Sequence, residues 1–218
     1  MIQYRDVGAL VSAVKENNYL ADAADLMDAI GAPYEKWSFE QMKDRFPFYD
    51  SGLYSPAKRP DNAGFGEATG GELKGGIYFP RSGYVSDPAQ AAANAEYAAK
   101  REGAEFLYNS EITEILIKGG RTAGVKLSDR TEHHAPVVVN IAGPHSSKIN
   151  QMAGVYDEMK IKTAALRHEV AHVPAPEGIN IEETGMVTSD SDISTYARPE
   201  TGNHVLAGSE DPACDTRE

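Results

Sequence analysis

The chain has 218 residues, of which 41% are hydrophobic and 25% charged, as is typical of a soluble globular protein with enough material for a core. A net charge of −12 repels nucleic acid and anionic membranes, so neither is expected as a partner. The single cysteine, Cys214, excludes a disulfide framework, and no signal or membrane-spanning stretch is visible, so a cytoplasmic protein is predicted.

Two helices are predicted near the N-terminus. Asn17–Ile30 places apolar residues at helical spacing. Ser38-Phe39-Glu40-Gln41 is a possible capping box, opening a second helix that ends before Pro47. The Gly-, Pro- and Asn-rich stretch Asp50–Gly76 is expected to be a loop, because its Gly64-Phe65-Gly66 lacks the third glycine and the preceding strand of a dinucleotide fingerprint.

Helix and strand signals then alternate along the middle of the chain. Asp87-Pro88 suits a helix start, and the alanine-rich segment that follows is expected to close at Gly103. Ala104–Asn109 is predicted to be a strand. Glu111–Lys118 and Thr122–Ser128 are predicted to form a hairpin, because two glycines join two β-rich runs.

The stretch 136–150 combines three signals. Val137–Val139 is a β-branched run typical of a buried parallel strand, and Gly143-Pro144 ends it at the possible start of a helix. A strand that turns on glycine into a helix is a common place to hold a polar ligand. An ordinary α/β joint explains the same residues, and His145 at this turn is more often structural.

The last third is expected to be an antiparallel sheet. Lys160–Val173 leans towards β-structure, and short strand candidates follow at Gly185–Ser189, Ser194–Arg198 and His204–Gly208. Together with the preceding elements these strands predict a mixed α/β (α+β) fold.

His168-Glu169-Val170-Ala171-His172 matches the H-E-x-x-H motif of zinc peptidases, which requires a helix so that both histidines lie on one face. Pro174 would interrupt such a helix, and on a strand the two histidines would lie about 13 Å apart. A sheet strand is therefore predicted. A zinc metallopeptidase remains a remote alternative, and no metal is expected.

Four stretches carry a resemblance to the D-amino-acid oxidase, sarcosine oxidase and dimethylglycine dehydrogenase superfamily of FAD-dependent oxidoreductases. They are Gly75–Ile115, Gly124–Ile149, Leu166–Val170 and Tyr196–Glu200. Their order and spacing over more than half of the chain are more specific than any single motif. The resemblance implies a partial FAD-binding Rossmann-like layer and part of an antiparallel substrate-domain sheet.

The resemblance also implies roles for individual residues. The FAD adenine would lie against Ile112, and the cofactor would approach the turn at the end of the valine strand, formed by Ala142, Gly143, Pro144 and His145. Tyr196 and Arg198 would lie on the sheet that faces the flavin, where Arg198 could pair with a substrate carboxylate. A structural role for Arg198 is the alternative, and no catalytic residue can be assigned.

The chain departs from the family pattern at both ends. The N-terminal βαβ unit with its G-x-G-x-x-G is absent, as is the C-terminal segment. The chain is therefore expected to be a truncated reading frame, a fragment or one subunit of a split enzyme. The implied domains are residues 1–82, a helical insert and loop of the substrate domain, 83–155, part of the FAD domain, and 156–218, part of the substrate sheet.

The resemblance implies oxidation of the C–N bond of a secondary or tertiary amine or an amino acid. This chain alone is expected to be inactive and not to retain FAD, because it lacks the glycine loop for the pyrophosphate. A second chain could supply the missing unit. A non-catalytic subunit or scaffold of a split flavoenzyme is the alternative.

Overall fold

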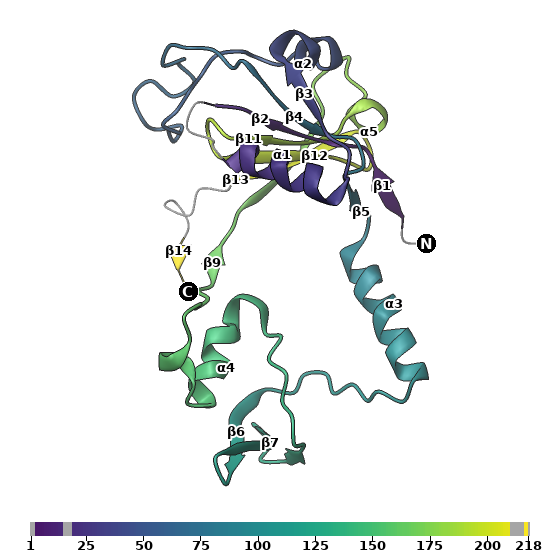
Figure 1. Cartoon of the computed structure of the whole chain (residues 1–218), viewed down its shortest axis with the longest axis vertical. Helices are drawn as coiled ribbons and strands as arrows, with labels where there is room; N and C mark the ends of the chain where they lie inside the picture. Colours follow the sequence, from purple (N-terminus) through teal and green to yellow (C-terminus); the bar gives the residue numbers. More distant parts are fainter. Residues whose placement is uncertain (1–2, 15–18, 210–215, 218) are drawn as a thin grey trace. The chain divides into compact units, whose positions relative to one another are not determined.

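The computed structural model describes residues 3–14, 19–209 and 216–217, so Cys214 and the first two residues of the predicted helix Asn17–Ile30 lie outside it. The chain divides into two compact units (Figure 1). Unit 1 comprises Met1–Ala93 and His168–Asp211, and unit 2 comprises Asn94–Arg167 and Pro212–Glu218. No helix in the described part of the chain is long and apolar enough to span a bilayer.

Unit 1 contains a seven-stranded mixed sheet with the strand order β10-β13-β12-β11-β2-β4-β3. Its strands are β2 (Ala9–Ser12), β3 (Glu35–Ser38), β4 (Gly75–Phe79), β10 (Val170–Pro174), β11 (Val187–Asp190), β12 (Thr195–Glu200) and β13 (His204–Ser209). The pair β11 and β2 is parallel, and the other neighbours are antiparallel. The sheet therefore joins the two ends of the sequence. A separate antiparallel pair is formed by β1 (Tyr4–Asp6) and β5 (Gly83–Val85).

Helices cover the two faces of this sheet with different residues of the same strands. Helix α1 (Tyr19–Ile30) packs Leu20 and Ala24 against Ile77 on one face. Helix α2 (Phe39–Arg45) packs against the opposite face, where Met42 contacts the fully buried Leu10. Neighbouring residues of a strand point to opposite faces, which explains why β2 and β4 contribute to both cores.

The predicted capping box begins α2. The backbone N–H of Gln41 donates to Ser38 Oγ at 3.4 Å, and the N–H of Ser38 donates to Gln41 Oε1 at 2.8 Å. The predicted strands of the last third are also confirmed, as β11, β12 and β13. The sequence did not indicate β2, β3 and β4, because these are short strands whose pairing is non-local.

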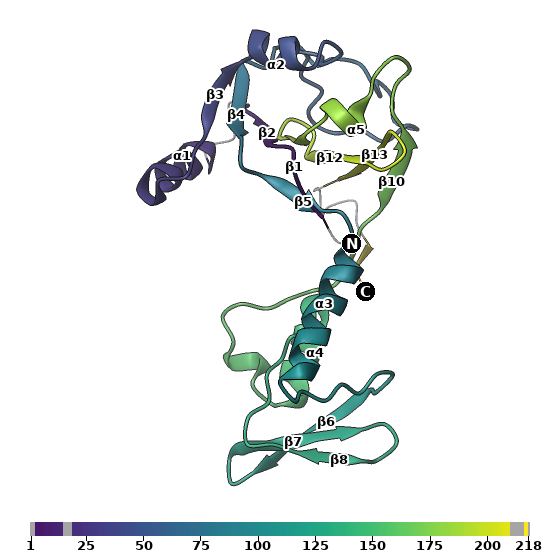
Figure 2. The same cartoon turned by 90° about the vertical axis from the view of Figure 1, so that its right-hand side faces the viewer.

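Unit 2 contains a three-stranded sheet and short helices (Figure 2). The predicted hairpin is confirmed as β6 (Ile112–Lys118) and β7 (Arg121–Leu127), and β8 (Glu132–His134) extends it. Helix α3 (Pro88–Arg101) crosses from unit 1 into unit 2, and α4 (Ser146–Met152) packs against β6. The two-residue strands β9 (Leu166–Arg167) and β14 (Thr216–Arg217) pair with each other.

Two strand predictions in unit 2 are wrong. The run 137–139 is not a buried parallel strand: Val137 is 69% exposed and Val139 73% exposed, and neither belongs to a strand. Ile141, at 86% exposure, continues the same alternation. Ala104–Asn109 likewise contains no strand, and Leu107 is 60% exposed. A parallel strand needs a neighbouring strand for its N–H and C=O groups, and the described residues place none beside these segments.

Candidate functional site

The candidate site is one face of the sheet in unit 1, over β10, β13 and β12. Helix α1 packs on this same face at β2 and β4, where the described contacts involve Val11, Ile77 and Phe79. We call the remainder the open face. Strand pairing brings nine positions onto it, of which all are exposed or half-exposed: Val170, His172, Pro174, Tyr196, Arg198, Glu200, His204, Leu206 and Gly208.

Arg198 lies in the middle of β12 on the open face and is held from two sides. Its Nη1 forms an ion pair with Glu200 Oε2 at 2.8 Å and also donates to the carbonyl of Pro199 at 3.1 Å. The ring of Tyr84 lies 4.4 Å from the guanidinium carbon. Among described residues, Nε and Nη2 have no hydrogen-bond acceptor. One edge of the guanidinium is therefore occupied and the other is available.

Glu200 is the anionic partner of this arginine. Its Oε1 accepts a hydrogen bond from the backbone N–H of Thr201 at 2.9 Å. This bond, together with the charge of Arg198, lowers the pKa of Glu200 below its ordinary value. The side chains of Arg198 and Glu200 are 21% and 20% exposed, so the ion pair is shielded from much of the solvent.

Tyr196 lies two residues before Arg198 and points to the same side. Its ring lies over Gly208, where an added Cβ would come within 2.5 Å of the Tyr196 hydroxyl. A glycine is therefore required for the ring to lie flat on β13. A cleft of about 560 Å³ lies beside Tyr196, Val170 and Gly208. Most of its other lining residues, Ala171, Thr195, Ala197 and Ala207, belong to the opposite face of the same strands.

The second histidine of the H-E-x-x-H motif also lies on the open face. His172 is on β10, as predicted, and its ring stacks on that of His204 with 4.5 Å between centroids and 8° between planes. A zinc peptidase needs His168 and His172 on one helix, and the strand at His172 excludes this geometry. No group of three or more His, Cys, Asp or Glu that could hold a metal occurs in the described part of the chain.

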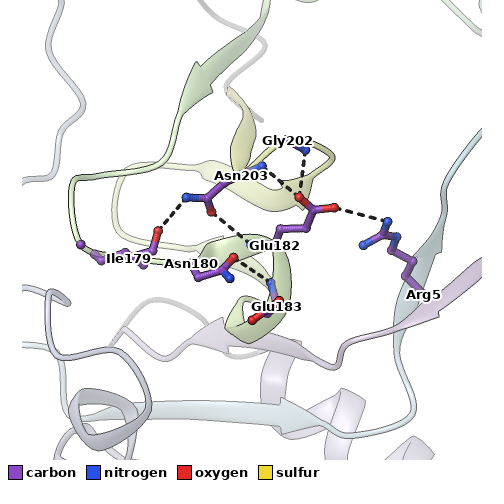
Figure 3. Close-up of a pocket in the computed structure, with 8 residues that line it drawn as sticks. Arg5, Ile179, Asn180, Glu182, Glu183, Gly202 and Asn203 are labelled. Carbon is purple, nitrogen blue, oxygen red and sulfur yellow. Dashed lines mark hydrogen bonds and ion pairs between the residues drawn. The ribbon is translucent and has the colours of Figure 1, made fainter.

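A larger cleft, of about 700 Å³, lies beside the β12–β13 turn and the short helix α5 (Ile181–Thr184) (Figure 3). Its polar groups bind one another. Glu182 Oε2 accepts from the backbone N–H groups of Gly202 and Asn203 at 2.9 and 3.0 Å, and Oε1 lies 3.7 Å from Arg5 Nη2. Asn203 Oδ1 accepts from the N–H of Ile181 at 2.8 Å. We interpret these hydrogen bonds as structural, because they fix the β12–β13 turn against α5.

The residues predicted to contact FAD lie in unit 2. Ile112 begins β6 and is half-buried opposite Leu127. The turn Ala142–His145 precedes α4, and each of its residues is exposed. Because α4 packs against β6, these two segments belong to neighbouring elements. Tyr196 and Arg198 belong to unit 1, where the structure brings them together on the open face.

Sequence reasoning missed Glu200, Tyr84 and the histidine stack. Glu200 could have been found, because residues i and i+2 of a strand share a face and an Arg-x-Glu spacing allows an ion pair. Tyr84 and His204 carried no such signal, since each meets its partner through tertiary pairing.

A family model described as "FAD dependent oxidoreductase" (DAO) matches residues 1–218. Mitochondrial sarcosine dehydrogenase of Mus musculus is 30% identical over 131 residues, which cover 58% of this chain and 13% of that protein. L-proline dehydrogenase from P. horikoshii has a similar fold, with a TM-score of 0.71 and 18% identity over 96% of this chain and 50% of that one. Glycine oxidase from Geobacillus kaustophilus gives a TM-score of 0.66 and 20% identity, over 99% and 49% of the two chains.

Proposed function

The chain belongs to the family of FAD-dependent oxidoreductases, and we propose that it is part of an enzyme that oxidises the C–N bond of a secondary or tertiary amine or an amino acid. The chain spans about half the length of the solved structures that it resembles. In the complete enzyme, residues 83–155 contribute to the FAD-binding domain, and residues 1–82 and 156–218 to the substrate domain. The compact units support this division only in outline, since their limits differ.

The observation that carries the proposal is the open face. It presents a tyrosine and an arginine with one available guanidinium edge on the same strand, which suits a small substrate that carries a carboxylate. Arg198 binds the carboxylate of an amino-acid substrate through Nε and Nη2, because a guanidinium edge matches a carboxylate in two parallel hydrogen bonds. Tyr196 packs against the remainder of the substrate.

The turn Ala142–His145 fits contact with FAD. Gly143 has a φ of +56°, and an added Cβ would meet nothing within 4 Å, so space is open in front of the backbone. Ile112 offers an apolar surface for the adenine. When bound, FAD supplies the acceptor for the hydride that leaves the substrate carbon. The residues of this chain orient the substrate and shield it from water.

The exposed segment 137–141 supports the need for a further α/β unit. Asn140 turns towards α4 and bonds to Ser146 and Asn150, whereas Val137, Val139 and Ile141 point away and are exposed. An extended segment with one packed face and one apolar exposed face is typical of a sheet whose neighbours are missing. We propose that a strand–GxGxxG–helix unit, from a second chain or from the same polypeptide, covers it.

Coexpression with such a Rossmann-type unit tests the proposal. We expect the full chain alone to be colourless, and the complex to absorb near 450 nm and to bleach when an N-methyl amino acid is added without oxygen. Val139→Asp should prevent assembly by placing a charge in the buried interface. Ile161→Asp is the matched control, because Ile161 is at least as exposed as Val139 but lies outside the segment 137–141. A complex that never binds flavin would contradict the proposal.

A flavin-free scaffold subunit is the second candidate, and the exposed valines also favour it because a scaffold likewise needs a partner. The two candidates differ in one result. A stable complex that lacks flavin supports the scaffold, whereas flavin that appears only in the complex supports the split enzyme.

A further inference from the structure

We propose that Glu200 determines substrate specificity by making the open face selective for zwitterions over simple carboxylates. The inference rests on the proposed function, in which Arg198 binds the substrate carboxylate. It adds that a second group, the carboxylate of Glu200, attracts a positively charged substrate nitrogen.

The geometry divides the guanidinium of Arg198 into two parts. The Nη1 atom is saturated, since one N–H bonds to Glu200 Oε2 and the other to the carbonyl of Pro199. Tyr84 covers one face of the plane. A ligand carboxylate can therefore bind only through Nε and Nη2. The ligand then lies on the edge of the guanidinium away from Nη1, several ångströms from the Glu200 carboxylate and within range of its charge.

The charges of this arrangement oppose a bare carboxylate. The negative charge of Glu200 balances the positive charge of Arg198, so the proposed carboxylate-binding site at Arg198 has no net charge. A second carboxylate on Arg198 is repelled by Glu200 across several ångströms. A cationic nitrogen two bonds from the carboxylate carbon, as in an α-amino acid, is instead attracted to Glu200. The carboxylate of Glu200 is held at both oxygens. Its Oε2 pairs with Arg198, and its Oε1 accepts a hydrogen bond from the backbone N–H of Thr201 at 2.9 Å.

Two ligands of the same shape isolate this effect. N-methylglycine is a zwitterion at pH 7, and butanoate is its isostere with a methylene in place of the ammonium. Titration of each into the full ¹⁵N-labelled chain, followed by the Nε–H resonance of Arg198, gives their dissociation constants. Arg198→Lys assigns that resonance. We expect N-methylglycine to bind about fivefold more tightly than butanoate, as screened charges at this range predict.

The variant Glu200→Gln should remove the preference, mainly by tightening the binding of butanoate. Glu72→Gln is the control, because Glu72 is exposed, lies in the same unit and pairs with Lys74 at 3.7 Å, away from the open face. It changes the net charge equally and should leave the preference unchanged. The fluorescence of the single tryptophan, Trp37, checks that each variant of unit 1 is folded.

The outcomes separate the inference from the proposed function. The role of Glu200 is overturned if the two ligands bind the unmodified chain equally, or if the preference for N-methylglycine survives Glu200→Gln. Either result leaves carboxylate binding by Arg198 intact. If neither ligand shifts the Arg198 resonance, Arg198 does not bind a carboxylate. That result contradicts both the proposed role of Arg198 and the selectivity assigned to Glu200. The comparison in the unmodified chain needs no variant, so a poorly folded variant does not decide the result.

Discussion

Similar apolar segments differ in pairing and burial between the two units. In unit 1, short apolar segments such as Ala9–Ser12 pair on both sides and are buried, with Leu10 only 1% exposed. In unit 2, the run Val137–Val139 has higher β-propensity but is unpaired, and Val137 and Val139 are exposed. The difference shows that available strand partners, rather than intrinsic propensity, decide which segments become strands.

The largest expected effect is on the core of unit 1. Met42 is fully buried between α2 and the sheet, so Met42→Ala leaves a cavity and should lower the free energy of unfolding by about 2–5 kcal/mol. Trp37 stacks on Tyr78, with ring centroids 4.2 Å apart beside this core, so its fluorescence in urea reports the loss. An unchanged urea midpoint would show that the core is not closely packed.

The next effect is a pH dependence of unit 1. Burial against the core, aided by the charge of Asp190, raises the pKa of Tyr49 to about 12. In the unfolded chain the Tyr49 hydroxyl loses its proton near pH 10, whereas in the folded chain it keeps the proton until about pH 12. The free energy of unfolding is therefore constant below pH 10 with respect to this group and falls by about 2 kcal/mol as the pH rises to 12. Urea unfolding at pH 9 and pH 11 measures the first part of this fall, about 1.4 kcal/mol. Tyr49→Phe should make it smaller, and an equal fall in that variant would count against the assignment.

A smaller effect is expected at the start of α2. Ser38→Ala removes the oxygen that accepts from the N–H of Gln41 and should cost about 1 kcal/mol. The same Trp37 transition measures it. Ser38→Asp, which restores an acceptor, should recover most of the loss, and failure of this rescue would argue against capping.

The smallest effect is expected in unit 2. Val139→Ala should change the stability of the chain by less than about 0.5 kcal/mol, because the side chain is already 73% exposed. Hydrogen exchange at the amides of β6 and β7 follows unit 2 separately from Trp37. A large loss of protection would mean that the valine run packs within this chain, and the contrast between the units would disappear.

Local interactions were the part of the fold that could be predicted. The capping box at Ser38, the hairpin around Gly119-Gly120 and the helix start at Asp87-Pro88 each depend on residues within a few positions of one another. The proline-based rejection of a helix at His172 rests on the same kind of short-range constraint. Tyr196 and Arg198 could be placed on one strand face, since alternation fixes the side on which they lie.

The sequence by itself determined the family, the mixed α/β class and the positions of the hairpin and the C-terminal strands. Only the tertiary structure decided that Ala9–Ser12 pairs in parallel with Val187–Asp190, that Tyr84 stacks on Arg198 and that His172 meets His204. It also decided that the most strand-like valines are unpaired. The physical reason is that a strand is completed by hydrogen bonds to another segment, and a sequence window contains no information about whether that segment is present.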